Sequence, residues 1–303
     1  MTARLTAPAR LALAVLLCLP FACGRAADAA DPGQAKTESF LASLHPASGT
    51  VAIPGAPAHL ALKPGYGFLD AHDAQRVLSE LWRNPPDKDV LGMILPSNDP
   101  HVLLDDNSWA VVVTYVPDGY VSDADAAGID YDKMLHDMQE SAHDENDERR
   151  KQGFPAVELA GWAEPPHYDN ASHKLYWARD LIFSQDGHSG HSLNYDIRVL
   201  GRQGYLSLNA VAPIDQLAQV KADMPQVLAM TDFDAGQRYT DFDKSTDKLA
   251  AYGIGALVAG GIAAKAGLFA KLGVMLLALK KFIVLGLAAI AGLFKKLFRR
   301  KQA

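Results

Sequence analysis

Acidic and imidazole side chains gather in one short stretch of the sequence, GWAEPPHYDNASHKLYWARDL, over residues 161–181. Glu164, His167 and Asp169 could form an acid–base cluster, because catalytic proton transfer uses carboxylates and imidazoles held within hydrogen-bonding reach. Alternatively, the prolines at 165–166 stiffen the exit from a strand, and the Asp–Asn pair after Tyr168 favours a turn. Spacing does not fix the mutual geometry of these groups, so both interpretations stay open.

Two histidine patterns could bind a metal. His188 and His191 form H-x-x-H, while His136, Glu140 and His143 share one face of a predicted helix at i, i+4 and i+7. The first pattern falls in a predicted hairpin turn, and the second in a strongly charged helix. A solvated turn and a solvated helix face are therefore the alternatives, and no cofactor is predicted.

The motifs of familiar enzyme classes are missing. The sequence has no G-x-S-x-G, no S-x-x-K with its companion motifs, and no Walker A, H-E-x-x-H or EF-hand pattern. Both cysteines, Cys18 and Cys23, lie near the N-terminus, so the body has no cysteine nucleophile, thiolate site or disulfide. These absences favour a non-enzymatic role over a hydrolase or transferase.

Hydrophobic spacing predicts an α+β domain over residues 49–231. Alternating or apolar runs predict strands at 90–96, 109–116, 156–163, 174–183, 193–200 and 205–212. Helices are expected after Asp70, over 131–151 and over 213–230, with the polar second half of the middle helix projecting into solvent. Strands with one apolar face indicate an antiparallel sheet flanked by helices. Trp162 and Trp177 could pack as a cross-strand pair.

The N-terminus is typical of a secretory signal. Arg4 and Arg10 precede an apolar core at 11–21 and then small residues, so residues 1–29 are predicted to be a signal peptide, followed by a linker over 30–48 with a short helix. Lipidation of Cys23 is an alternative, although Pro20 departs from the pattern that lipidation requires.

The C-terminus predicts a membrane anchor. Residues 249–303 carry nine Lys and Arg and no acid, whereas 30–248 carry a net charge of −17, given +2 over 1–29 and −6 overall. A span over 250–270 would present Ala256, Gly260 and Ala264 as a packing face. The basic tail contains Lys295, Lys296, Arg299, Arg300 and Lys301.

Charge also predicts orientation and partners. One crossing followed by an interfacial helix keeps the basic tail cytoplasmic at an anionic inner-membrane surface, with the body periplasmic, and two short crossings are the alternative. An acidic body argues against nucleic-acid binding. The segment 232–248 is predicted to be an acidic linker to the anchor.

Several stretches resemble a known family. PGYGFL, VLGMILP, GWAEPPHYDNASHKLYWARDL and LNYDIRVLGRQGYLSLNAVA are similar to bacterial membrane-anchored proteins grouped as a domain of unknown function, family 2167. The resemblance covers the chain from about Thr50 onward and implies a signal peptide, a periplasmic body and a C-terminal anchor, with no established activity. The element order is also similar to that of PsbP-like extrinsic domains, which are mostly non-catalytic.

These features favour a membrane-anchored binding module with a protein partner or envelope ligand. A tethered hydrolase or transferase acting through residues 164–180 is one alternative. An accessory subunit of an envelope transporter or channel, with the anchor packing in the bilayer, is the other.

Overall fold

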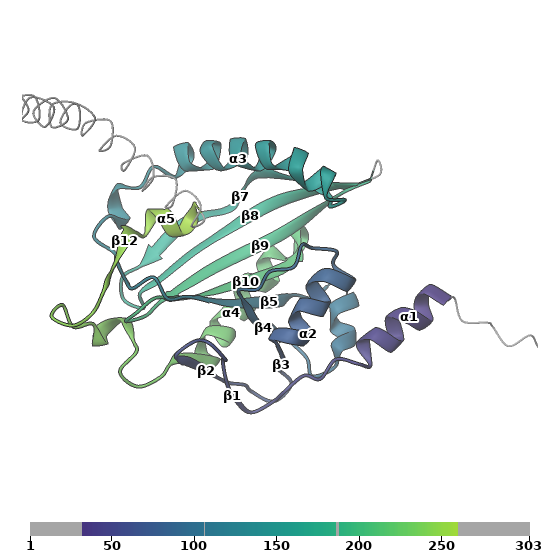
Figure 1. Ribbon diagram of the computed structural model, residues 1–303, viewed down its shortest axis with the longest axis horizontal. Coiled ribbons are helices and arrows are strands. Elements are labelled where there is room, and N and C mark those ends of the chain that lie inside the picture. Colours follow the sequence, from purple (N-terminus) through teal and green to yellow (C-terminus); the bar gives the residue numbers. More distant parts are fainter. Residues whose placement is uncertain (1–31, 106, 186–187, 260–303) are drawn as a thin grey trace, which may run out of the picture. The chain divides into compact units, whose positions relative to one another are not determined.

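A seven-stranded antiparallel sheet is the largest element of the computed structural model, which describes residues 32–105, 107–185 and 188–259 (Figure 1). Its strand order is β3-β4-β5-β10-β9-β8-β7. The strands are Gly67–Asp70 (β3), Val90–Leu95 (β4), Ala110–Val116 (β5), Ala156–Asp169 (β7), Lys174–Gln185 (β8), His188–Leu200 (β9) and Tyr205–Pro213 (β10). The predicted α+β class, with an antiparallel sheet and several helices, is confirmed.

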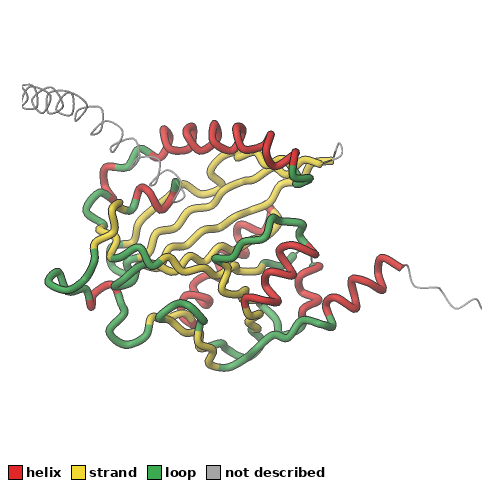
Figure 2. The backbone as a smooth tube through the Cα atoms, in the orientation of Figure 1, coloured by secondary structure: helices red, strands yellow, loops and turns green. Residues whose placement is uncertain are grey.

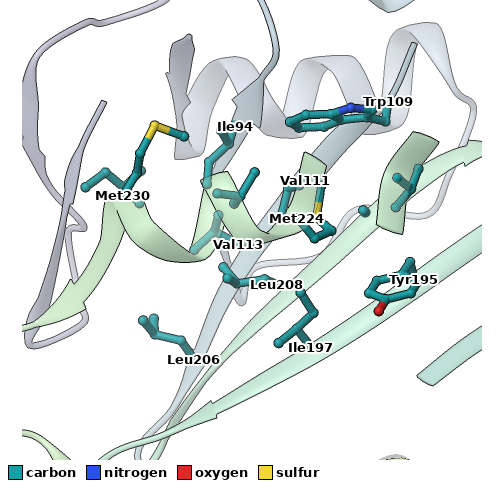
Figure 3. Close-up of a cluster of buried hydrophobic side chains, with 14 of the residues drawn as sticks. Ile94, Trp109, Val111, Val113, Tyr195, Ile197, Leu206, Leu208, Met224 and Met230 are labelled. Carbon is teal, nitrogen blue, oxygen red and sulfur yellow. The ribbon is translucent and has the colours of Figure 1, made fainter. Parts of the chain in front are cut away.

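One face of this sheet is buried beneath helix α4 (Leu217–Met230), which follows a 3₁₀ turn at Ile214–Gln216 (Figure 3). Alternate residues of each strand point to this face, because successive side chains of a strand lie on opposite sides of the sheet. Strands β9 and β10 contribute Leu193, Tyr195, Ile197, Leu206 and Leu208, and α4 contributes Val220, Met224, Val227 and Met230. Burying each such aliphatic side chain stabilises the fold by roughly 1.5–3 kcal/mol.

The predicted helix after Asp70 is present as α2 (Ala71–Arg76), which widens into a π-helix at Val77–Leu81. The Asp70 carboxylate accepts a hydrogen bond from the Asp73 N–H at 2.9 Å and so caps the helix. A 3₁₀ helix at Pro100–Leu104 precedes β5. Helix α1 (Pro32–Leu41) lies almost wholly in an N-terminal unit that ends at Phe40, and all the elements named above belong to the second unit, which begins at Leu41.

Helix α3 (Tyr131–Lys151) follows a short 3₁₀ helix at Ala126–Gly128 and runs along the edge strand β7. Its second half was expected to project into solvent, and most side chains there are exposed, but one of them packs on β7. The Asn146 side chain is 2% exposed, accepts from the Val157 N–H at 2.7 Å and donates to the Val157 carbonyl at 2.9 Å. Gln139 donates to the Leu159 carbonyl at 3.0 Å. The helix thus pairs backbone groups that an edge strand would otherwise leave open.

Residues 232–248 were expected to form a linker, and they belong to the folded body instead. Strand β11 (Thr231–Phe233) pairs with β2 (Ala58–Ala61), which also pairs with β1 (Thr50–Ala52). A 3₁₀ helix follows at Tyr239–Asp241. Phe233 is 4% exposed and Tyr239 6% exposed, so aromatic residues within the acidic segment fix it to the core.

The predicted membrane span is also wrong at its start. Strand β12 (Leu249–Gly253) pairs in parallel with β6 (Tyr120–Ser122), and helix α5 (Gly255–Val258) packs into a second core cluster. Protein contacts bury Leu257 and Val258, and Ala256 is half-buried. In residues 32–259, apart from the gaps named above, no helix is long and apolar enough to cross a membrane.

Several predictions concern residues outside the described ranges. The signal peptide over 1–29, the packing residues Gly260 and Ala264, and the basic tail from Lys295 to Lys301 all lie there. Figure 2 shows how the helices and strands of the described body are distributed.

Candidate functional site

The stretch that suggested an acid–base cluster forms the outer hairpin of the sheet. Strand β7 continues through the prolines at 165–166 to Asp169, because an edge strand tolerates residues without an N–H. The pairing with β8 shifts between Glu164 and His167, so a bulge re-aims the chain there. Trp162 lies opposite Arg179, which leaves Trp162 and Trp177 diagonal rather than directly paired; both belong to the second core cluster.

Glu164 and His167 lie on the sheet face that α4 covers. Glu164 Oε2 is 2.9 Å from Lys221 Nζ on α4, and Oε1 is 3.9 Å from His167 Nδ1. The His167 ring stacks on Tyr176 with centroids 5.0 Å apart. The carboxylate is therefore neutralised by a lysine, and its separation from His167 exceeds the reach of direct proton transfer.

Asp169 is committed to a turn rather than to this pair. Its carboxylate accepts from the Ala171 N–H at 2.9 Å and from the Ser172 hydroxyl at 2.6 Å. The hydrogen bond from Ser172 has the largest effect and that from Ala171 the next, and together they lower the pKa of Asp169 below its ordinary value. The turn interpretation of this residue is supported.

The described residues of the two histidine patterns lie as follows. His136 and Glu140 are exposed and 3.9 Å apart, and His143 is exposed on the same helix. Positions 188 and 191 both lie on strand β9, where a hairpin turn was predicted. The His191 ring pairs with Asp180 at 2.8 Å.

Asp70, His72 and Asp73 bring possible metal ligands within 4.8 Å of one another, a group that the sequence did not single out. Helix capping and ion pairing explain it. Asp70 is the N-cap, and Asp73 accepts from the His45 N–H at 2.9 Å and lies 3.5 Å from Arg76. Burial opposes ionisation of Asp73, but the hydrogen bonds from His45 and His72 keep its pKa below the ordinary value.

The opposite face of the sheet carries the more informative cluster, which we call the arginine–aspartate triad: Arg179, Asp196 and Arg198. Arg179 donates to Asp196 Oδ2 from Nε at 3.0 Å and from Nη2 at 2.7 Å, and Arg198 donates to Oδ1 at 3.2 Å. Asp196 is 1% exposed, while the Arg179 and Arg198 side chains are 24% and 13% exposed. The Arg198 guanidinium also lies 4.6 Å from the Trp177 ring. Two cations and one anion leave a net charge of +1.

A pocket of about 370 Å³ adjoins the triad on the same face. Its floor includes Asn194 and Asn209, and its wall comes from the segment between α2 and β4. Asn194 is the register partner of Arg179, and Asn209 is that of Asp196. The other polar lining residues are Asn84, Asp87 and Ser192, and the rest of the lining is apolar: Leu78, Trp82, Pro85, Pro86, Val90, Val112, Phe183 and Val211. A concave, mostly apolar pocket with a few polar groups is typical of small-molecule sites.

Two buried polar atoms on this face have no hydrogen-bond partner within the described ranges, Asn209 Oδ1 and Trp177 Nε1. Buried polar atoms are usually paired, because an unpaired one costs about 1–3 kcal/mol. Asn209 lines the pocket, so a donor on a bound molecule would satisfy its oxygen.

The alternation of residues along β9 is the sequence signal for this site. Asn194, Asp196 and Arg198 alternate with the buried residues of β9 and so share one face. Their partner Arg179 lies on the neighbouring strand β8. It is opposite Asn194 and therefore diagonal to Asp196. Only the strand register shows that the two meet.

The fold defines an α+β domain whose sheet is covered by α4 on one face and carries the triad, the pocket and the second core cluster on the other. The chain belongs to the family described as protein of unknown function (DUF2167), whose model matches residues 45–291. This confirms the resemblance seen in the sequence motifs. No curated protein matches the chain.

Two solved structures are similar at low identity. Cyanobacterial PsbP (CyanoP) from Synechocystis sp. PCC 6803 is 14% identical, with a TM-score of 0.34, covering 70% of this chain and 98% of that chain. The Ran-binding protein Mog1p of Saccharomyces cerevisiae is 13% identical, with a TM-score of 0.28, covering 66% of this chain and 100% of its own. Neither similarity is close enough to bear on function.

Proposed function

We propose that this protein is a non-catalytic binding module whose ligand occupies the pocket beside the arginine–aspartate triad. The observation that carries the proposal is the buried Asn209 Oδ1, which lines a pocket of about 370 Å³ and has no partner in the described residues. The pair that suggested catalysis supports the non-catalytic reading, because Glu164 is neutralised by Lys221 on the opposite face.

The same proposal includes a location. The signal-like N-terminus and the apolar, basic C-terminus support export of the body to the periplasm and retention at the inner membrane, with the tail cytoplasmic. Because β12 and α5 pack on the body, the anchor would begin after residue 259. A cytoplasm-specific reporter fused after Ala303 should be active, and activity of a periplasm-specific reporter instead would contradict this orientation.

Native mass spectrometry of the detergent-solubilised full chain tests the binding function. After incubation with a low-molecular-weight bacterial envelope extract, the wild type should carry an added mass. Ser192→Trp, which places a bulky ring in the pocket lining, should not. Ala218→Trp, on the exposed surface of α4 and outside the pocket lining, is the control and should retain the added mass. No adduct on the wild type, or equal adducts on wild type and Ser192→Trp, would contradict the proposal.

A further inference from the structure

We propose that the ligand of this pocket is a small amphipathic molecule with a single carboxylate head, held by Arg179 and Arg198, and an apolar body held by the pocket wall. This inference rests on the proposed binding function and adds the chemical class of the ligand. It combines the charge of the triad, the donors left on its guanidinium groups and the lining of the adjoining pocket.

Charge selects the head group. The triad has two cations around one buried carboxylate, so one positive charge is uncompensated within it. The body as a whole is strongly acidic, and one carboxylate, Asp87, lies in the wall of the pocket, so the triad is the positive group at this site. A carboxylate with one negative charge would neutralise the triad, whereas a doubly charged phosphate would leave an excess negative charge beside Asp196.

Guanidinium geometry supplies the hydrogen bonds. Each arginine side chain has five N–H donors in a planar fork that matches a carboxylate. Asp196 accepts two of those from Arg179, through Nε and Nη2. Arg198 uses Nη1 toward Asp196 and toward the Ile197 carbonyl at 3.4 Å. Asp196 therefore orients both forks while donors remain for a second oxyanion.

The pocket selects the rest of the molecule. Asn194 lies beside Arg179 across the strands, so the apolar pocket begins one residue pair from the triad, at a Cα separation of about 5 Å. Trp82, Pro85 and Phe183 would enclose an apolar group, and Asn209 Oδ1 would accept from a ligand N–H. An N-acylated apolar amino acid has a carboxylate, an N–H and an apolar side chain in this order.

Isothermal titration calorimetry of the solubilised full chain tests this class with three probes. N-acetyl-L-phenylalanine carries the carboxylate, N-acetyl-L-phenylalaninamide is its neutral match, and phenyl phosphate carries the alternative oxyanion. The acid should bind about tenfold to a hundredfold more tightly than the amide, as expected for charge-assisted hydrogen bonds. It should also bind more tightly than phenyl phosphate.

Variants locate the effect. Arg179→Gln should remove most of the preference for the acid over the amide. Lys221→Gln removes a cation from the opposite face and should leave that preference unchanged. The acid–amide comparison on the wild type does not depend on whether Arg179→Gln folds.

The possible outcomes distinguish a failure of the carboxylate assignment from a failure of the proposed binding function. Equal binding of acid and amide, tighter binding of phenyl phosphate, or no binding of any probe would overturn the carboxylate assignment. An envelope adduct that Ser192→Trp abolishes would then still support a binding pocket. Loss of the preference in Lys221→Gln but not in Arg179→Gln would place the anion site on the other face and overturn the assignment.

Discussion

Arg179 on β8 holds Asp196 on β9 through two hydrogen bonds to one carboxylate oxygen, at 3.0 and 2.7 Å. The two residues are diagonal neighbours, because Arg179 is paired in register with Asn194. Since Asp196 is 1% exposed, its charge depends on this arginine and on Arg198 for compensation. The pair thus stabilises the sheet and also fixes the guanidinium groups that we assign to ligand binding.

Replacing Asp196 with Asn should lower the free energy of unfolding. The two arginines would face each other without their shared carboxylate, and we expect a loss of roughly 2–3 kcal/mol, below the cost of breaking a fully buried pair because the arginines are partly exposed. Urea titration of the full chain measures this. Asp180→Asn, which breaks only the pair with the half-exposed His191, is the control and should change stability by about 0.5 kcal/mol or less. Equal effects of the two variants would refute the structural role of Asp196.

Replacing Asn146 with Leu should open the edge of the sheet. The Val157 N–H and carbonyl would both lose their partner, at a cost of about 1–3 kcal/mol. Hydrogen exchange at the Val157 amide should accelerate in the same variant. Ser141→Ala, on the exposed side of α3, should leave that amide protected, and an unchanged exchange rate in Asn146→Leu would contradict the edge-capping role.

Acid should weaken the attachment of the segment before β12. Arg202 donates to both oxygens of Asp247, at 2.7 and 3.0 Å, and this hydrogen bonding holds the pKa of Asp247 below its ordinary value. A carboxyl whose pKa is lower in the folded state than in the unfolded state stabilises the fold at any pH above its unfolded-state pKa of about 3.9. This contribution is lost as the pH falls through the folded-state pKa. The gap in Tm between wild type and Asp247→Asn should therefore be larger at pH 7 than at pH 3. A Tm difference for Asp247→Asn that stays constant between pH 7 and pH 3 would argue against the linkage.

Replacing His167 with Ala should not affect ligand binding. The ring stacks on Tyr176 on the face that α4 covers, so its loss should lower the free energy of unfolding by about 1 kcal/mol. The affinity for N-acetyl-L-phenylalanine should stay the same. Asn209→Ala, on the face that carries the pocket, is the matched variant and should weaken the affinity for N-acetyl-L-phenylalanine. If His167→Ala weakened binding and Asn209→Ala did not, the ligand would bind on the face that α4 covers, which would contradict the proposed site.

The sheet was largely predictable from local pattern. Strands β4, β5, β8, β9 and β10 coincide with the apolar or alternating runs, because one buried face imposes a period of two on the sequence. The helix N-terminus at Asp70 could also be predicted, because a carboxylate three residues before a free helix N–H is a local sequence signal.

Tertiary pairing decided the parts that were predicted wrongly. Leu249–Gly253 has a composition that suits a helix, yet it forms β12 because β6 supplies backbone partners. Phe233 and Tyr239 fix an acidic segment that composition alone marks as a linker. The triad could not be predicted for a related reason, because the contact between Arg179 and Asp196 depends on the register between two strands.

A crystal structure of the full chain with N-acetyl-L-phenylalanine would test the central claim most directly. The account predicts the carboxylate within hydrogen-bonding distance of Arg179 or Arg198, the N–H at Asn209 Oδ1 and the phenyl ring between Trp82 and Phe183. A ligand bound on the α4 face beside Glu164 and Lys221, or a pocket left empty at saturating ligand, would contradict it.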